Sequence, residues 1–393
     1  MTLDIAAVQK SLQAERLDGW LLYDFHGSNP IAQRLADLAS GGHMTTRRWY
    51  LLIPATGQPR ALVHAIERHN LDQLPGAKIV YSRREELEEG LTRLLAGMTR
   101  VAMEYSPDGA IPYVSRVDAG TFEAVRRRGL EVVSSGDLVQ QFEATWTAEQ
   151  LATHRRAADA LYRIKDRAFE AAAAALAGRR SLSEFGLQQQ MVRWFEEEGL
   201  ISDSPPVVAV GSHAGDPHYL PTSARSSEIV ADEVLLLDLW GKEAGAGAVF
   251  ADITWVGVTS THVPGEVGAA FQAVADARDT AVRIVSDAAR DGGDLRGWQV
   301  DRAARAVLEG AGYAANILHR TGHSLGENVH GNGTHLDDFE THDDRRILAD
   351  TGFTVEPGLY FDHFGVRSEI NVFRTHHDAV VTGPRQSAVV TLR

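Results

Sequence analysis

The sequence predicts an α/β domain over residues 1–146 followed by an α+β domain over residues 147–393. Two observations predict this division. In the first part, short apolar runs alternate with amphipathic segments at the spacing of a compact α/β domain. A capping box, Thr147-Ala148-Glu149-Gln150, then begins a long helical pattern, after which strands and helices no longer alternate strictly.

The first domain opens with a helix, because apolar residues recur at helical spacing over residues 5–15. The turn Ala55-Thr56-Gly57-Gln58 between two apolar runs indicates a hairpin. We expect strands over 19–25, 48–54, 60–65, 101–103 and 131–133, and helices over 85–95 and 119–128. The domain has no Gly-rich phosphate loop, so we assign it a supporting role in oligomerisation or as a wall of an active site.

The second domain begins with the helix that follows the capping box and ends near Gly178. Its alanine-rich stretch, 171–175, keeps the helical period of its neighbours and therefore predicts packed helix. Further helices are expected over 183–198, 266–290 and 298–310, and strands over 207–211, 234–239, 251–258 and 354–360.

Composition limits the class of protein. The chain has 393 residues, 44% of them hydrophobic, which is enough for full cores in two or three domains. It contains no cysteine, so a disulfide framework and a thiolate metal site are both excluded. Any metal must be bound by histidine, aspartate and glutamate.

The charge and the chain start favour a soluble cytoplasmic protein. A formal net charge of −14, with no basic stripe, disfavours nucleic acid as a partner. The first twenty residues show no apolar core of signal-peptide length, and the longest apolar runs are too short to span a bilayer, so we expect no membrane partner.

Five ionisable residues interrupt apolar or glycine-rich segments of the second domain. They are Asp238, Asp252, His323, Glu356 and Glu369. Each alone has an ordinary explanation, since an acid at a strand end is commonly a turn or cap residue and a histidine beside glycine a loop residue. Four carboxylates could not converge on apolar scaffolding without cations, however, because buried charge is costly unless it is compensated. The five are therefore either scattered or hold metal. Two divalent ions would neutralise the set, and oxygen-rich ligation with one histidine suits Mn²⁺, Co²⁺ or Zn²⁺.

The order Asp, Asp, His, Glu, Glu resembles the pita-bread-fold metallopeptidases, the creatinase/aminopeptidase family. The motifs that carry the resemblance are Leu237-Asp238-Leu239, Ala251-Asp252-Ile253-Thr254, Gly322-His323-Ser324-Leu325-Gly326, Val355-Glu356-Pro357-Gly358 and Arg367-Ser368-Glu369. The resemblance covers roughly residue 147 onward and implies a pita-bread catalytic domain. The preceding segment looks like the creatinase-like N-terminal domain of prolidases (Xaa-Pro dipeptidases) and Xaa-Pro aminopeptidases. A homodimer is implied as well.

The resemblance also implies roles. Asp252 and Glu369 would bridge two divalent ions, Asp238 would bind one, and His323 with Glu356 would bind the other. We expect Mn²⁺, with Co²⁺ or Zn²⁺ as alternatives. Glu356 would also move the proton of an activated water to the leaving nitrogen. Three more histidines match the family pattern: His218 and His330 as catalytic and substrate-binding residues, and His319 as a substrate contact; the ordinary alternative for all three is a surface or loop histidine. Arg367 is interpreted as a partner of a metal-binding carboxylate.

Two features depart from the family pattern. The two aspartates are separated by 252 − 238 = 14 residues, and Gly241 to Gly247 is expected to form a wider turn than in relatives. After His330, where relatives often have an acid and a nearby proline, the chain reads Gly331-Asn332-Gly333-Thr334-His335. The departures affect the rim and the proline pocket rather than the ligands.

The expected reaction is hydrolysis of the bond before proline in a peptide with proline in second position. We favour Xaa-Pro dipeptides, with Xaa-Pro aminopeptidase activity on longer peptides as the alternative. A pita-bread protein used only for binding, or a metal-free creatinase-like hydrolase, would be expected to lack some ligands, whereas this chain has all five.

A last hypothesis concerns residues 32–48 of the first domain. This segment contains Gly41-Gly42 and the charged residues Arg34, Asp37, His43, Arg47 and Arg48. Its ordinary interpretation is a solvated helix and loop. As an alternative, we expect a mobile lid in which Arg34, or one of Arg47 and Arg48, binds the carboxylate of a dipeptide, because a guanidinium can grip a carboxylate in two places.

Overall fold

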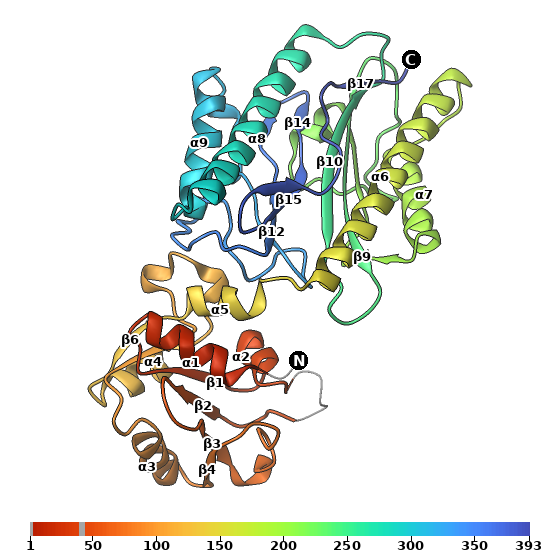
Figure 1. The fold of residues 1–393 in the computed structure, drawn as a ribbon. Helices are drawn as coiled ribbons and strands as arrows, with labels where there is room; N and C mark the ends of the chain where they lie inside the picture. The colour runs from red at the N-terminus through yellow and green to blue at the C-terminus, as the bar shows by residue number, and fades with distance from the viewer. Residues whose placement is uncertain (1–2, 39–43) are drawn as a thin grey trace. The chain divides into compact units, whose positions relative to one another are not determined.

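The computed structural model describes residues 3–38 and 44–393, which fold into two compact units, Met1–Glu143 and Ala144–Arg393. Figure 1 shows their helices and strands along the chain. The division lies slightly before the boundary expected from the capping box at Thr147. That box is present, because Thr147 and Gln150 exchange bonds between side chain and backbone at the start of α6.

The first unit is a mixed six-stranded sheet with the order β4-β3-β2-β1-β5-β6. Its strands are β1 (Gly19–Asp24), β2 (Trp49–Pro54), β3 (Arg60–His64), β4 (Ala77–Tyr81), β5 (Arg100–Met103) and β6 (Glu131–Ser134). Its helices are α1 (Ile5–Ala14), α2 (Pro30–Leu35), α3 (Arg84–Leu94), α4 (Ala119–Arg126) and α5 (Gly136–Glu143). Alternate residues of β1 pack on opposite faces. Trp20 and Leu22 join one core with residues of α1, α2 and α5, and Leu21 and Tyr23 join another with residues of α3.

The second unit contains four long helices around small sheets. The helices are α6 (Ala148–Ala177), α7 (Glu184–Glu197), α8 (Gly265–Asp291) and α9 (Gly297–Gly310). One sheet contains β7 (Leu200–Ile201), β8 (Val207–Val210), β9 (Val234–Glu243), β10 (Ala251–Val258) and β17 (Val390–Thr391). A second contains β11 (Ser324–Leu325), β12 (Thr351–Val355), β15 (Ile370–Arg374) and β16 (Ala379–Val381), while β13 (Gly358–Tyr360) pairs with β14 (Gly365–Arg367).

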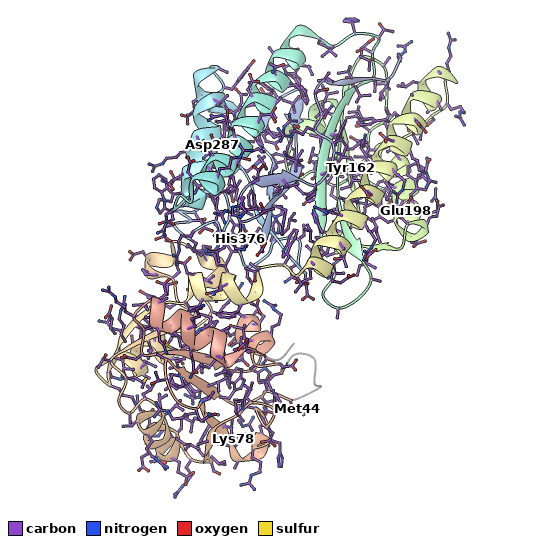
Figure 2. All side chains as sticks on the ribbon, viewed as in Figure 1. Met44, Lys78, Tyr162, Glu198, Asp287 and His376 are labelled. Carbon is purple, nitrogen blue, oxygen red and sulfur yellow. The ribbon has the colours of Figure 1, made fainter. Side chains whose placement is uncertain are left out.

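The β9–β10 hairpin separates two cores. Leu237 and Ile253 pack in one core with apolar residues of α6 and α7, whereas Leu236 and Val256 pack in the other with α8, α9, β12 and β15. Figure 1 shows the same arrangement, with α6 and α7 on one side of the strands and α8 and α9 on the other. In Figure 2, Tyr162 lies where α6 passes the sheet, and its ring packs edge-on against Trp255, at 6.1 Å between ring centroids.

Two expectations about this unit are wrong in detail. The predicted strand over 354–360 is two strands, β12 and β13, which end and begin around Glu356-Pro357 because proline has no N–H for a ladder. The wide turn expected from Gly241 onward begins only after Glu243. Lys242 and Glu243 pair with β7 and therefore extend β9.

Among the described residues, no helix has both the length and the apolar character needed to cross a membrane.

Candidate metal centre

Asp238 and Asp252 meet because β9 and β10 pair antiparallel. In this register Asp238 lies opposite Thr254, and Trp240 lies opposite Asp252. Residues directly opposite each other point to the same face of a sheet, so the two carboxylates form a diagonal pair on one face. Leu236 and Val256 occupy that face as well, and they pack toward β12 and β15. The carboxylates therefore point between the two main sheets of the unit.

Glu356 and Glu369 come from the ends of the neighbouring ladder. Val355 of β12 pairs with Ile370 of β15, and the two glutamates occupy the next position on each side. Glu369 also joins the first sheet, because its N–H donates to the Thr254 carbonyl at 3.2 Å and Thr254 Oγ1 donates to Glu369 Oε2 at 2.7 Å. These bonds place the acid ends of β12 and β15 beside the aspartates of the hairpin.

His323 completes the group from the segment that leads into β11. Its N–H donates to Thr354 Oγ1 at 2.9 Å, and its carbonyl accepts from Thr354 N at 2.8 Å. The Nδ1 atom lies 3.1 Å from the Ser324 carbonyl, which favours the tautomer with the proton on Nδ1. The other nitrogen, Nε2, is 3.5 Å from both Asp252 Oδ2 and Glu356 Oε1. In that tautomer Nε2 carries no proton and points at carboxylates, as in a metal-binding imidazole.

The donor set fits divalent metal. One ligand atom each from Asp252, His323 and Glu369 lies within 4.8 Å of the others. Asp252 Oδ1 and Glu369 Oε1 are buried and have no hydrogen-bond partner in the described part of the chain. A buried carboxylate oxygen without a donor is costly, so both atoms are suited to binding a cation. They belong to the two residues that the resemblance implies as bridging ligands.

Electrostatics lead to the same conclusion. Burial raises the pKa of Asp252 well above its ordinary value, and the nearby charges of Asp238 and Glu356 raise it further. Burial and the charge of Asp252 raise the pKa of Glu369 in the same way. Glu356 differs, because the combined effect of His323, His319, Arg367 and Arg320 outweighs its burial and lowers its pKa. The carboxylates of Asp238, Asp252 and Glu369, whose pKa values are all raised, would be stabilised in this buried site by divalent cations.

Arg367 contacts a proposed ligand, as the sequence predicts. Its guanidinium forms an ion pair with Asp238 and donates to Thr254 Oγ1 at 2.9 Å and to the Tyr360 hydroxyl at 3.1 Å. Tyr360 in turn lies 2.7 Å from His319 Nε2, and His319 Nδ1 is 2.7 Å from the Arg320 carbonyl. Both ring nitrogens of His319 therefore have protein partners, which leaves neither for a substrate in this arrangement.

The other two predicted histidines differ in their surroundings. The His330 ring lies 4.3 Å from the His323 ring, centroid to centroid, at the edge of the ligand group. Although the residue is exposed, desolvation of the ring, followed by the effect of His323, lowers its pKa to about 4. His218 is exposed and follows the short helix η4 (Gly211–Gly215); its N–H donates to Asp216. No contact joins His218 to the five proposed ligands among the residues described.

The segment predicted as a lid is only partly described. Gly41, Gly42 and His43 lie outside the described residues, while Arg34 lies in α2. The Arg34 guanidinium makes a two-pronged ion pair with Glu143 of the same unit, with its shortest N–O distance at 2.6 Å. Its side chain therefore already has a carboxylate partner.

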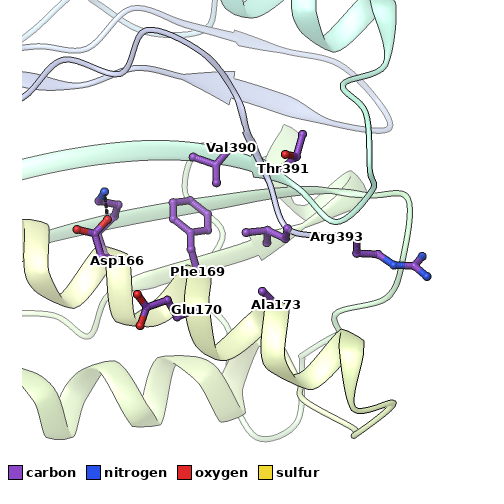
Figure 3. Close-up of a pocket in the computed structure, with 9 residues that line it drawn as sticks. Asp166, Phe169, Glu170, Ala173, Val390, Thr391 and Arg393 are labelled. Carbon is purple, nitrogen blue, oxygen red and sulfur yellow. Dashed lines mark hydrogen bonds and ion pairs between the residues drawn. The ribbon is translucent and has the colours of Figure 1, made fainter.

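Sequence reasoning missed two residues that organise the ligands. Thr254 bonds to Glu369 and Arg367, and Asn371 Oδ1 accepts from the Asp252 N–H at 2.9 Å. Both could have been found from the period of a strand, since each lies two residues after a proposed ligand and shares its face. A surface pocket shown in Figure 3, between α6 and β17, is lined by none of the proposed ligands.

A family model described as "Metallopeptidase family M24" matches residues 153–382, which is more than half of the chain. The match spans all five proposed ligands.

Similarity to individual proteins is low in sequence but extensive in fold. The chain is 25% identical over 238 residues to an Xaa-Pro dipeptidase of Lactobacillus delbrueckii subsp. lactis, covering 59% of this chain and 58% of the relative. The chain spans less than two thirds of the length of the curated relatives that it matches, between 42% and 64% among the first of them.

Two crystal structures resemble the whole chain. Dipeptidase PepE from Mycobacterium ulcerans has a TM-score of 0.70 at 21% identity, covering 99% of this chain and 96% of that one. A recombinant prolidase from Thermococcus sibiricus has a TM-score of 0.62 at 18% identity, with complete coverage of both chains. At these identities the likeness concerns the fold, and it confirms the expected pita-bread architecture with an N-terminal α/β domain.

Proposed function

Because the chain belongs to metallopeptidase family M24, we propose that it hydrolyses the Xaa-Pro bond of dipeptides at a centre of two divalent metal ions. The observation that carries this proposal is the pair of buried, unpartnered oxygens on Asp252 and Glu369 beside Nε2 of His323. Asp238, Asp252, His323, Glu356 and Glu369 would hold the ions, with Asp252 and Glu369 as the ligands that both ions would share. Mn²⁺ is the proposed metal, with Co²⁺ or Zn²⁺ as alternatives.

The chemistry has to overcome an unreactive bond. A bond to proline has no N–H, and the proline ring fills the space that general peptidases use. When bound, the divalent ions supply Lewis acidity at the scissile carbonyl and lower the pKa of the attacking water. The protein then has to move one proton and stabilise one developing negative charge.

Glu356 is the proposed proton carrier. Thr354 Oγ1 donates to Glu356 Oε1 at 3.0 Å and fixes the orientation of the carboxylate, whose Oε1 is also 3.5 Å from His323 Nε2. From this position Glu356 accepts a proton from water and passes it to the leaving imide nitrogen.

His330, at the edge of the ligand group, is proposed to donate a hydrogen bond to the developing oxyanion or the adjacent carbonyl. His218, which is exposed and follows η4, is proposed to bind the proline side of the substrate. A substrate contact by His319 would require its ring to give up a partner, since its nitrogens bond to the Tyr360 hydroxyl and the Arg320 carbonyl.

The alternative function is Xaa-Pro aminopeptidase activity on longer peptides. A dipeptidase has to bind the carboxylate of a C-terminal proline, whereas an aminopeptidase does not. Arg34, the residue proposed to bind this carboxylate, is paired with Glu143, so binding would require Arg34 to exchange its ion-pair partner. Replacing Arg34 by alanine should then raise KM for a dipeptide more than for the matching proline amide. We also propose a homodimer, as the family resemblance implies, a supporting role for the N-terminal unit, whose sequence has no Gly-rich phosphate loop, and a cytoplasmic location.

The deciding experiment is a panel of Ala-Pro, Ala-Pro-Ala and Ala-Ala with added Mn²⁺, Co²⁺ or Zn²⁺, together with elemental analysis of the purified protein. We expect bound divalent metal, cleavage of Ala-Pro and little cleavage of Ala-Ala. Preferential cleavage of Ala-Pro-Ala would establish the aminopeptidase alternative. Absence of both bound metal and metal activation would overturn the proposal.

A further inference from the structure

The loop between β7 and β8, residues 202–206, lies beside the ligand-bearing strand. Both flanking strands pair with β9, since Ile201 lies opposite Lys242 and Val207 lies opposite Asp238. The five loop residues therefore bulge out from β9 next to Trp240. Asp203 in this loop is exposed.

Trp240 connects this loop to the proposed metal centre. It lies opposite Asp252 and thus shares a face with both aspartate ligands. Its ring packs against a small core that contains Leu325 and Val329, in the segment between His323 and His330. Its indole Nε1 donates to Asp203 Oδ1 at 2.6 Å. The Trp240 side chain therefore connects the β9–β10 hairpin to the segment between His323 and His330, and its Nε1 fixes the carboxylate of Asp203.

The charge of Asp203 remains available. Within residues 3–38 and 44–393, the indole is its single hydrogen-bond partner and no lysine or arginine pairs with it. By contrast, Asp238 is paired with Arg367, and Asp252 and Glu369 have buried oxygens suited to metal.

We propose that Asp203 binds the α-ammonium group of the first substrate residue. The inference rests on the proposed function and deepens it, because an Xaa-Pro substrate carries a free ammonium on the residue before the scissile bond. Trp240 fixes one carboxylate oxygen and leaves the other to accept a charge-assisted hydrogen bond. An anion at this point selects peptides with exactly one residue before proline, since a chain extended at its amino end has no ammonium there.

The test uses two probes that differ only in this group, glycyl-proline and hydroxyacetyl-proline, in which a neutral hydroxyl replaces the ammonium. The variant is Asp203→Asn, whose amide oxygen can still accept the bond from Trp240. For glycyl-proline we expect kcat/KM to fall about tenfold through KM, since hydrogen bonds to charged groups have about this effect. For hydroxyacetyl-proline we expect little change, and metal content should stay at the wild-type level.

The matched control is Asp232→Asn, which removes the same charge from an exposed position before β9 with a backbone φ of 67° that asparagine tolerates. It should leave the ratio of kcat/KM for the two probes unchanged. An equal loss for both probes in Asp203→Asn would show a general effect on the site and overturn the proposal, as would an unchanged ratio.

Binding separates this inference from the proposed function. Calorimetry on metal-loaded Glu356→Gln, with and without Asp203→Asn, measures Kd for the two probes without requiring turnover. A selective tenfold weakening of glycyl-proline supports ammonium binding even if the wild-type protein fails to cleave Xaa-Pro bonds. Equal Kd changes for both probes, or none, would overturn ammonium binding even if the wild-type protein is an active dipeptidase.

Discussion

Glu356 stands apart from the other proposed ligand carboxylates because it faces two histidines. Its Oε1 lies near His323 Nε2 and accepts from Thr354 Oγ1, so Glu356→Gln can keep the same shape and the same threonine bond. An amide cannot accept the proton of a water molecule. We expect the variant to fold normally and to lose at least about a hundredfold in kcat, as is common when a general base is removed.

The measurement for Glu356→Gln is kcat on Ala-Pro at saturating Mn²⁺, with circular dichroism and elemental analysis alongside. Glu309→Gln, on the exposed side of α9, is the matched control and should keep wild-type turnover. Wild-type turnover in Glu356→Gln would remove the proton-carrier role.

Asp252 and Glu369 lead to a prediction about metal rather than turnover. Their unpartnered oxygens repel in the buried site, so metal binding should stabilise the native state by mass action. In the wild-type protein, Mn²⁺ at a hundred times its Kd should stabilise by about 2.7 kcal/mol. Asp252→Ala and Glu369→Ala should each lose most of this stabilisation, measured as a smaller rise in Tm when Mn²⁺ is added.

Elemental analysis of Asp252→Ala and Glu369→Ala should show that at least one ion is absent, with Glu309→Ala as the unaffected control. Full occupancy in either variant would count against a bridging role for that residue.

At the scale of residues, the sequence indicated which side chains to propose as ligands but not the hydrogen bonds that hold them in place. Charge on apolar scaffolding drew attention to the five proposed ligands and the family resemblance supplied their roles, whereas Thr254 and Asn371 look like ordinary strand residues. Asp203 was missed for another reason: its relation to Asp252 runs through Trp240 and appears only once β7, β8 and β9 are paired.

At the scale of elements, periodicity predicted long helices and the β9–β10 hairpin well. Periodicity did not predict α2, β16 or β17, which are too short to show a regular apolar period. Asn29 caps α2 and Pro30 occupies its first turn, a start signal that resembles a turn when read without its continuation. The short strands β16 and β17 each add only a few residues to the edge of a sheet, so their own sequence carries little signal.

A glycine fixes the element that presents His323. A Cβ built on Gly322 would lie 2.1 Å from the Thr354 carbonyl oxygen of β12, so the two backbones approach too closely for any side chain. Gly322→Ala should push the His323 segment away from β12. We expect weaker binding of the ion proposed to be held by His323 and Glu356, measured as a rise in Kd for Mn²⁺ by calorimetry.

Gly310→Ala is the matched control for Gly322→Ala, because nothing lies within 4 Å of a Cβ at that position in α9. It should leave metal binding unchanged and stabilise the helix by up to about 1 kcal/mol. Unaltered Mn²⁺ affinity in Gly322→Ala would show that the histidine segment adjusts without loss of the site.

At the scale of the whole molecule, each unit contains a buried titratable group, away from the proposed metal centre, whose pKa is shifted mainly by burial. In the second unit, His154 lies between the Phe250 carbonyl and Thr382 Oγ1, each at 2.7 Å, and burial lowers its pKa to about 4. The unfolded chain therefore takes up this proton first, so the contribution of His154 to stability is lost as pH falls from about 6.5 toward 4.

Glu104 in the first unit has the opposite effect on the pH dependence of stability, because it stabilises the fold at low pH. Its carboxylate accepts from Trp20 Nε1 at 2.7 Å, Asn29 Nδ2 at 2.9 Å and Ser135 Oγ at 3.1 Å. Burial outweighs these bonds and raises the pKa to about 7 from an ordinary 4.5. The folded unit therefore holds this proton more tightly than the unfolded chain does. The resulting stabilisation is complete below about pH 4.5 and is lost as pH rises through 7.

Glu104→Gln should separate this effect from the many other titrations of the chain. Glutamine can still accept from Trp20 and Ser135, but its amide faces that of Asn29, so the variant should be less stable than the wild type at pH 5. The difference in unfolding free energy should then shrink by up to about 3 kcal/mol between pH 5 and pH 8, because only the wild type loses the contribution of this group. Urea unfolding of metal-free protein across this range measures the difference and cancels the titrations that both proteins share. A constant difference would mean that Glu104 is already ionised at pH 5, with its three donors outweighing its burial.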